Sequence, residues 1–239
     1  MDGRCVIKAQ MPVTPGTSIA IGPKVHFLEN GIKVLYEDRT LIVLEKPEGV
    51  LSVATDYDTT ANLHTILKRR QKAGRVFPVH RLDRETSGIM LFAYTLTAQK
   101  HLKRQFEKRL VEKTYYAIVK GKPALSSGTW ESYLKEDESF HVHSSANPES
   151  GEHAITHYEV TSSQNGKSLL RLRPVTGKKH QLRVHCKEAG IPILGDPRYG
   201  SEQSAKRLCL HAQKLSFTHP VTEKKMCFEG SLPEIFNQL

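Results

Sequence analysis

A group of ionisable and hydroxyl side chains precedes an apolar run near the first third of the chain. Residues 80–88 read HRLDRETSG and continue into the strand-like segment 88–93, GIMLFA. Polar groups at the entrance to a buried strand cost stability unless they are paired or used. Asp83 is therefore a candidate nucleophile or acid–base group. The simpler interpretation is a charged turn in which Asp83 pairs with Arg81 or Arg84.

A second polar segment could bind an anion. Residues 173–185 read RPVTGKKHQLRVH, with a turn at 176–177 before a predicted helix. The start of a helix presents unpaired N–H groups to an anion, and Lys178, Lys179 and Arg183 add positive charge. If Arg183 faced Asp83 across a cleft, it would keep that carboxylate ionised and oriented, as a nucleophile requires. The alternative is an exposed basic helix without a partner.

Two adjacent tyrosines follow in the segment 113–117, KTYYA. In a strand, Tyr115 and Tyr116 point to opposite faces, so one of them could line a cleft. An aromatic ring beside a basic cleft can stack on a nucleic acid base. Sheet packing of both rings is the simpler alternative.

Three other site types fit the sequence poorly. The segment 166–168 resembles the end of a phosphate-binding loop, but Thr161 stands where that loop needs glycine. The histidines and cysteines lack the spacing of known metal sites. No G-x-S-x-G motif supports a serine hydrolase, although a hydrolase that uses His80 and Asp83 stays as a weaker alternative.

The overall charge favours a polyanionic partner. The chain has 239 residues with a formal net charge of +10, and its sequence pI is about 9.4. Basic proteins of this kind often bind nucleic acids.

The sequence lacks a membrane-length apolar run and a secretory signal in its first twenty residues, and its four cysteines are scattered. We therefore predict a cytoplasmic protein.

The elements that would hold these residues belong to an α+β fold. Apolar alternation and turn signals predict strands at 18–21, 33–37, 41–45, 88–93, 114–119, 154–160 and 168–173. Helical periodicity predicts helices at 59–73, 97–110 and 179–189. The first helix would be capped by Thr59 or Thr60, and the second would bury Ala98, Leu102, Phe106 and Leu110. Strands outnumber helices without alternating regularly, which favours a largely antiparallel sheet.

Taken together, the motifs resemble those of the RluA family of pseudouridine synthases. The matching segments are LYEDRTLIVLEKPEGV (35–50), HRLDRETSG (80–88), KTYYA (113–117), TGKKHQLRVH (176–185), GIPILGDPRYG (190–200) and RLCLHAQKLSFTHP (207–220). The resemblance covers about residues 33–235. It implies a pseudouridine synthase fold: α+β, with a central, mainly antiparallel mixed sheet, flanking helices and a basic catalytic cleft. Residues 23–239 would form the catalytic domain, and residues 1–22 would be the remnant of an RNA-binding domain or a linker.

The resemblance also implies a reaction, in which uridine in RNA is isomerised to pseudouridine without a cofactor or metal. Asp83 would be the nucleophile, attacking the ribose or the uracil ring, and Arg183 would pair with it. Tyr115 would stack on the uracil and could help to take the proton from C5. Arg81 would fill the gap left by an everted base. Further RNA or active-site contacts are implied for His80, Lys178, Lys179, Gln181 and His185.

The expected partner is RNA, ribosomal RNA first and transfer RNA second, and the enzyme would act as a monomer without a membrane or an obligatory protein partner. Two positions depart from the family pattern. Lys178 stands where arginine is usual, and Glu152 stands where lysine is common. The alternative function is a catalytically silent RNA-binding protein that uses the same basic surface.

Overall fold

The computed structural model describes residues 26–54, 62–71, 74–145, 147–200 and 205–237. Their strands form one sheet with the order β1-β2-β3-β5-β11-β6-β10-β9-β7-β8, while β4 pairs with β5 and β12 with β11. The strands are β1 (His26–Phe27), β2 (Lys33–Glu37), β3 (Leu41–Lys46), β4 (Phe77–Pro78), β5 (Ser87–Ala93), β6 (Glu112–Lys120), β7 (Ser127–Glu136), β8 (Val142–Ser145), β9 (Glu152–Gln164), β10 (Lys167–Pro174), β11 (Leu210–Thr218) and β12 (Lys225–Glu229). The helices are α1 (Leu63–Arg70), α2 (Leu96–Glu107) and α3 (Gln181–Glu188).

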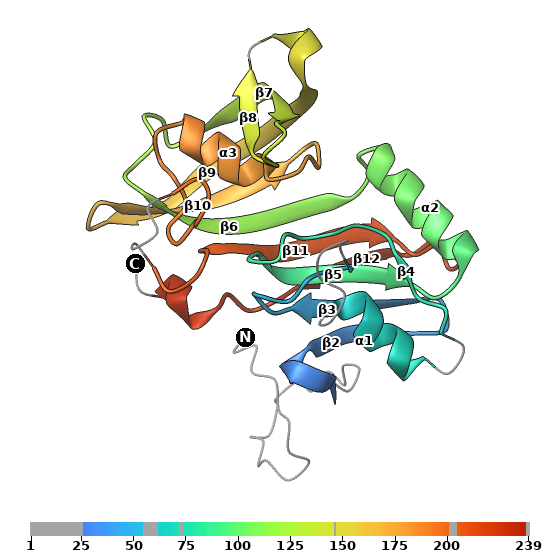
Figure 1. Ribbon diagram of the computed structural model, residues 1–239. Helices are drawn as coiled ribbons and strands as arrows, with labels where there is room; N and C mark the ends of the chain where they lie inside the picture. Colours follow the sequence, from blue (N-terminus) through green and yellow to red (C-terminus); the bar gives the residue numbers. More distant parts are fainter. Residues whose placement is uncertain (1–25, 55–61, 72–73, 146, 201–204, 238–239) are drawn as a thin grey trace, which may run out of the picture.

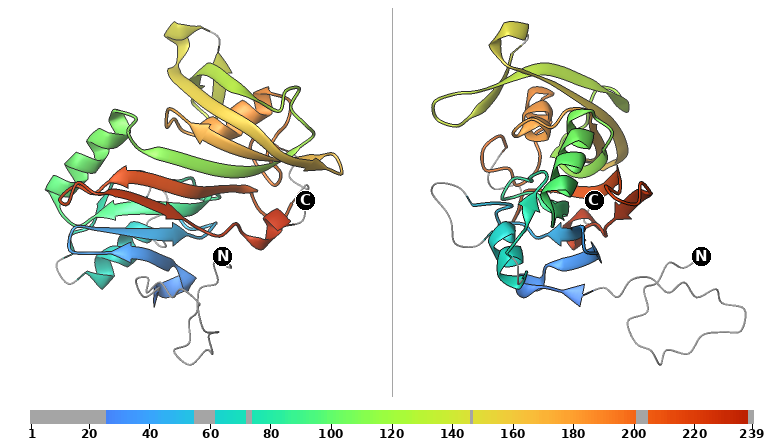
Figure 2. Two further views of the ribbon diagram at one scale, coloured as in Figure 1. Left: turned by 180° about the vertical axis from the view of Figure 1, so that it is seen from behind. Right: turned by 90° about the vertical axis from the view of Figure 1, so that its right-hand side faces the viewer.

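The arrangement confirms the predicted α+β class with a mainly antiparallel mixed sheet. Among the named strands of the described chain, β5 and β11 form the one parallel pair. In Figure 1 the sheet extends from β2 near the bottom to β7 and β8 at the top, with α1 beside β2 and β3. Figure 2 shows the upper strands curling around α3. The upper strands thus hold α3 on their concave side.

The predicted hairpin at 33–45 is confirmed as β2 and β3. Asp38 forms its turn, because Oδ1 accepts hydrogen bonds from the backbone N–H groups of Thr40 (2.7 Å) and Leu41 (2.9 Å). Strands β5, β6, β9 and β10 also occupy the predicted segments, each with bounds that differ by a few residues. The sequence analysis did not predict strands β1, β4, β7, β8, β11 and β12.

The helices begin and end differently from the prediction. α1 is capped by Asn62, whose side chain accepts from the Thr65 N–H (2.9 Å), so the prediction of Thr59 or Thr60 as the cap was wrong. α2 ends at Glu107, and Arg109 then adopts a left-handed φ of 59°. This turn leaves Leu110 64% exposed, so its predicted burial was wrong.

The core is built on the central strands. All seven residues of β5 are buried, because β3 and β11 flank the strand while apolar clusters cover both of its faces. None of the described helices is long and apolar enough to cross a membrane. The strand predicted at 18–21 and the RNA-binding remnant predicted at 1–22 lie outside the described residues.

The contact between β5 and β11 depends on a glycine. Gly88 lies opposite Ala212 and has a φ of 125°. A Cβ at Gly88 would lie 2.3 Å from the carbonyl oxygen of Ala212, which is too close for any side chain. Only glycine therefore allows the strand that follows Asp83 to pair with β11.

We expect Gly88→Ala to reduce the free energy of unfolding by about 3 kcal/mol or more, because it adds a backbone clash to an unfavourable φ. Urea denaturation followed by circular dichroism measures this change. The control is Gly166→Ala, where φ is 70° but nothing lies within 4 Å of the added Cβ. That variant should lose only about 1 kcal/mol. Equal losses in the two variants would contradict the close approach.

Candidate active site

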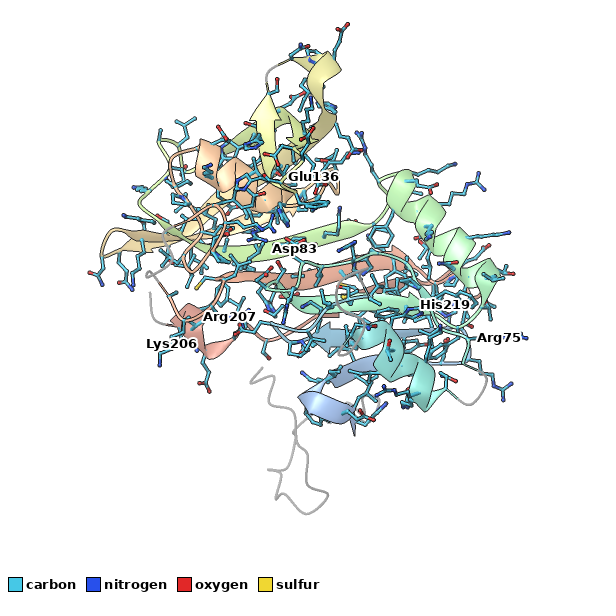
Figure 3. All side chains as sticks on the ribbon, in the orientation of Figure 1. Arg75, Asp83, Glu136, Lys206, Arg207 and His219 are labelled. Atoms are coloured by element: carbon cyan, nitrogen blue, oxygen red, sulfur yellow. The ribbon has the colours of Figure 1, made fainter. Side chains whose placement is uncertain are left out.

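The loop that carries Asp83 is held by the side chains of Lys46, the last residue of β3, and of Ser52. The Ser52 hydroxyl donates to the carbonyl of Leu82 (2.6 Å) and accepts from its N–H (3.0 Å). Lys46 Nζ donates to the carbonyls of Pro47 (2.9 Å), Val50 (2.7 Å) and Arg84 (3.0 Å). Burial lowers the pKa of Lys46 to about 7, despite the opposing charges of nearby carboxylates. Figure 3 shows Asp83 near the middle of the molecule.

A buried arginine connects Asp83 to a second carboxylate. Arg183 is 2% exposed, and its Nε and Nη2 donate to the two oxygens of fully buried Asp196 at 2.8 and 2.7 Å. Its Nη1 lies 3.3 Å from Asp83 Oδ2 and 3.5 Å from Glu85 Oε2. The predicted contact between Asp83 and Arg183 is therefore present in the structure, and Asp196 is an unpredicted member of the site.

This cluster keeps its charges despite burial. Burial opposes the charged form of each group, but the hydrogen bonds between Arg183 and Asp196 raise the pKa of the guanidinium and lower that of the Asp196 carboxyl. Asp196 also accepts from the N–H groups of Arg198 (2.9 Å) and Tyr199 (3.1 Å). Since one edge of the guanidinium is occupied by Asp196, the remaining nitrogen is directed at Asp83.

His180 approaches Asp83 from the same side and was not among the predicted site residues. It precedes α3 with a left-handed φ of 54°, and its Nε2 lies 3.9 Å from Asp83 Oδ2. Its Nδ1 lies 2.8 Å from the Tyr199 hydroxyl, which accepts from the Val142 N–H (3.1 Å). The hydroxyl can thus give its own proton to Nδ1, which leaves the ring proton on Nε2, toward Asp83. Burial lowers the pKa of His180, although the Asp83 charge opposes this.

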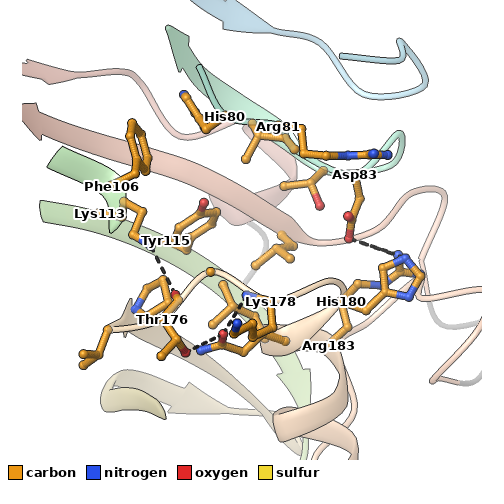
Figure 4. A pocket seen from close by; sticks show the side chains of 18 of the residues that line it. His80, Arg81, Asp83, Phe106, Lys113, Tyr115, Thr176, Lys178, His180 and Arg183 are labelled. Carbon is orange, nitrogen blue, oxygen red and sulfur yellow. Dashed lines mark hydrogen bonds and ion pairs between the residues drawn. The ribbon is translucent and has the colours of Figure 1, made fainter. Parts of the chain in front are cut away.

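A cavity of about 530 Å³ opens beside these groups. In Figure 4, Asp83, His180 and Arg183 lie at one end, Phe106, Lys113 and Thr176 at the other, and Tyr115 between them. The charged side chains that line it are Arg81, Asp83, Glu107, Arg109, Lys113, Lys178 and Arg183. Cations outnumber carboxylates in this lining, in agreement with the expected basic cleft.

The two adjacent tyrosines point to opposite faces of β6, as predicted. Tyr115 lines the cavity with Asp83, while Tyr116 lines a separate hollow on the other side of the sheet. Burial, with a smaller contribution from the Asp83 charge, raises the pKa of Tyr115 above its ordinary value. Its phenol therefore stays protonated at neutral pH and can stack or donate a hydrogen bond.

Two of the expected RNA contacts lie away from the cavity. Lys179 pairs with Glu136 and lies over the ring of Phe140. His185 is buried between the hydroxyls of Thr156 (2.9 Å) and Ser132 (3.1 Å), and burial lowers its pKa to about 4. Neither residue lines the cavity. Their positions in and before α3 direct both side chains to other faces than the cavity, and their expected contact with RNA stays a prediction.

Gln181 and His80 line the cavity but already have protein partners. Gln181 accepts from the Thr176 hydroxyl (2.7 Å) and the Lys178 N–H (3.0 Å), and it donates to Ile155 O and the Thr156 hydroxyl, both at 2.9 Å. His80 Nε2 accepts from the Leu91 N–H (3.1 Å). Burial lowers the pKa of His80 to about 3, so this ring is neutral. Both side chains therefore form part of the cavity wall, and these protein contacts occupy most of the polar atoms of Gln181 and one ring nitrogen of His80.

The two departures from the family pattern contact each other. Lys178 Nζ lies 2.6 Å from Glu152 Oε1 at the mouth of the cavity. The carboxylate occupies part of the hydrogen-bonding capacity of Lys178 and offsets its charge. Lysine at position 178 and glutamate at position 152 are therefore physically matched, which the separate motifs did not indicate.

Residues of the C-terminal motif contact the start of β5, directly after the loop that carries Asp83. Ser87 at the start of β5 accepts from Arg207 Nη2 (2.7 Å) and lies 2.7 Å from His211 Nδ1. Arg207 also pairs with Glu48. Burial lowers the pKa of His211 to about 4. In the described part of the chain, no three His, Cys, Asp or Glu side chains are arranged to hold a metal ion.

Comparisons with known proteins agree with this geometry. The sequence profile described as RNA pseudouridylate synthase matches residues 40–188. A dual-specificity RNA pseudouridine synthase RluA from Haemophilus influenzae is 37% identical over 219 residues, which are 85% of this chain and 94% of that protein. A ribosomal large subunit pseudouridine synthase C from Rickettsia bellii is 36% identical over 214 residues, 86% of this chain and 70% of that protein. The solved structure of human RNA pseudouridylate synthase domain containing 4 has a TM-score of 0.70 at 26% identity and covers 85% of this chain and 90% of its own.

The neutral buried histidines should make folding sensitive to mild acid. Above pH 6.5 both the folded and unfolded states hold them neutral. Below it the unfolded chain binds protons, while buried His185 stays neutral down to about pH 4, so stability falls. At pH 5 this residue alone should cost roughly 2 kcal/mol.

Urea denaturation of His185→Gln at pH 7 and pH 5 tests this. The difference in unfolding free energy between the two pH values should be smaller than in the wild type by about 2 kcal/mol. His101→Gln is the matched control, because His101 is exposed on α2. The same pH dependence in all three proteins would show that His185 titrates as freely in the folded state as in the unfolded one.

Proposed function

The chain belongs to the RNA pseudouridylate synthase family, as its RluA-type motifs indicated, and from this premise we propose that it isomerises specific uridines to pseudouridine in structured RNA with Asp83 as the nucleophile. In this reaction the bond between C1′ and N1 breaks, the base turns, and C1′ bonds to C5. The C5 proton leaves and N1 gains a proton, so that no atom is gained or lost overall. The observation that carries this proposal is the position of the Asp83 carboxylate, which faces a basic cavity and is held by a buried arginine.

The hydrogen bonds around Asp83 support a nucleophilic role. Arg183 and His180 both approach Oδ2, and among the described residues Oδ1 has no hydrogen-bond donor. The lone pairs of Oδ1 are therefore available for attack on the ribose or the uracil ring. Arg183 cannot rotate away while Asp196 holds its other edge. It would keep Asp83 oriented before and after the base turns.

Tyr115 would support the uracil ring. Its position beside Asp83 suits stacking on the base, which stabilises an everted nucleotide. Its raised pKa disfavours the phenolate that would take the C5 proton. The proposal therefore assigns stacking to Tyr115 and leaves proton removal to another base.

Arg81 would occupy the space that the everted base leaves in the RNA. Its side chain is exposed at the rim of the cavity, two residues before Asp83. Eversion costs a few kcal/mol and is cheapest in loops, so structured RNA with exposed loops is the expected substrate class.

Ribosomal RNA is the first candidate and transfer RNA the second. The ribosomal assignment is supported by the relative from Rickettsia bellii, whose name refers to the large ribosomal subunit. We place the enzyme in the cytoplasm, as a monomer.

Asp83→Asn should lower the rate of tritium release from RNA labelled with 5-tritiated uridine by at least about 1,000-fold, because the amide is a poor nucleophile. Its fold and most of its RNA affinity should persist. Asp137→Asn, which neutralises an exposed carboxylate outside the cavity, should retain wild-type turnover. Full activity in Asp83→Asn would exclude the mechanism. If the wild type bound RNA but released no tritium from any cellular RNA, the silent RNA-binding alternative would be favoured.

Tyr199→Phe should lower kcat by about 10-fold with little change in KM, since it removes the hydroxyl that directs the Nε2 proton of His180 toward Asp83. Steady-state assays of tritium release measure both constants. Tyr133→Phe serves as the control, because that ring stacks on His153 outside the cavity. If Tyr199→Phe and His180→Gln multiplied their separate effects when combined, the two residues would be acting independently.

A further inference from the structure

The cavity continues well beyond the groups assigned to chemistry. From Asp83 it passes Tyr115 and ends near Phe106, Lys113 and Thr176 (Figure 4). Lys113 and Tyr115 lie two residues apart on β6 and face the same side, about 7 Å from each other along the strand. A nucleotide whose base lies on Tyr115 would therefore have part of its backbone near Lys113.

Lys113 carries a charge that the protein does not neutralise. Its Nζ donates to the Thr176 carbonyl (3.1 Å), and no carboxylate of the described residues lies within 4 Å of it. The lysines of the neighbouring motif differ, because Lys178 pairs with Glu152 and Lys179 with Glu136. An ammonium group has three N–H donors, so two of those on Lys113 are free for a ligand.

The surroundings of Lys113 leave room for that ligand. A Cβ at Gly177 would lie 3.6 Å from Nζ, so this glycine keeps one side of the ammonium open. Arg109 lines the same cavity, lies four residues before Lys113 in the chain and forms no ion pair with a described residue. Burial lowers the pKa of Lys113 to about 8, which is the penalty of a partly buried cation without a counter-ion.

We propose that Lys113, assisted by Arg109, binds a backbone phosphate of the substrate RNA next to the everted uridine. An anion is the ligand that a half-buried, unpaired cation favours, and the phosphodiester is the anion that RNA supplies at this distance from the base. The assignment deepens the proposed function and rests on it, since it assumes that the base occupies the position beside Tyr115.

The proposal predicts a specific dependence of binding on pH. Lys113 is protonated below about pH 8 and neutral above it, whereas a phosphodiester stays negative throughout. Affinity for RNA should therefore fall as pH rises from 7 to 9.5. Lys113 lines the cavity and also the hollow on the other side of the sheet. The charged or titratable groups that line the cavity with it are His80, Arg81, Asp83, Glu107, Arg109, Tyr115, Lys178, His180 and Arg183. Those that line the hollow with it are Arg109, Glu112, Tyr116, His157, Arg171, Arg173, Lys214 and Glu229.

The test measures RNA affinity in the Asp83→Asn background, so that no turnover occurs. At pH 7, Lys113→Gln should bind about 10-fold more weakly, and the slope of log affinity against log salt concentration should decrease by about 0.7 to 0.9, the value for one phosphate contact. At pH 9.5 the RNA affinity of the protein that keeps Lys113 should fall to that of Lys113→Gln. Lys113→Arg keeps its charge at both pH values and should not show this loss.

Lys103→Gln is the charge-matched control, because Lys103 is exposed on α2 and does not line the cavity. The phosphate site would be contradicted if Lys113→Gln changed the salt slope no more than Lys103→Gln. It would also be contradicted if RNA affinity depended on pH in the same way with Lys113 present as in Lys113→Gln. Tritium release by the unsubstituted enzyme is measured separately. Release without an effect of Lys113 would remove this inference and leave the proposed function in place.

Discussion

The site depends on how one buried guanidinium is shared. Arg183 contributes a single positive charge to three carboxylates, those of Asp196, Asp83 and Glu85. Breaking a buried pair of this kind is costly, since the remaining charge has no solvent to stabilise it. The pairing with Asp196 is the better one in both distance and burial. It fixes the plane of the guanidinium, and the weaker contact with Asp83 follows from that plane. This inequality suits the nucleophilic role that we propose for Asp83, because the carboxylate is oriented while one of its oxygens stays free of donors among the described residues.

Much of this could be predicted from local sequence. The alternation of a strand sent Tyr115 and Tyr116 to opposite faces, and the motifs indicated that Asp83 and Arg183 would meet. The helix starts and ends were less predictable, because Thr59, Thr60 and Asn62 are all residue types that cap helices, and no residue near Arg109 indicated its left-handed conformation. Membership of the same motif also did not predict which way each side chain points. Lys179 and His185 belong to the same motif as Arg183, yet they face Glu136 and Ser132 on other sides.

The residues that sequence reasoning missed act through long-range contacts. Asp196 lies in a segment that the resemblance covered, but nothing local indicated that it would face Arg183. His180 was inside a recognised motif, and its unusual backbone conformation was the feature that turned its ring toward Asp83. The pairing of Lys178 with Glu152 likewise joins two positions that looked like unrelated exceptions. Compensating exceptions in separate motifs are therefore a signal of contact that could be sought in other sequences.

The position of β11 has a consequence for synthesis of the protein. This strand lies between β5 and β6 in the sheet, although it is made about a hundred residues after them. On the ribosome, β5 and β6 cannot be joined through β11 until residues 210–218 have emerged, and until then each has an unpaired edge. Unpaired edges invite association with other chains, and contacts of such large sequence separation form slowly. The nascent chain thus holds the loop that carries Asp83 without the contacts of Arg207 and His211 with Ser87, and these contacts form only when the central strand arrives late.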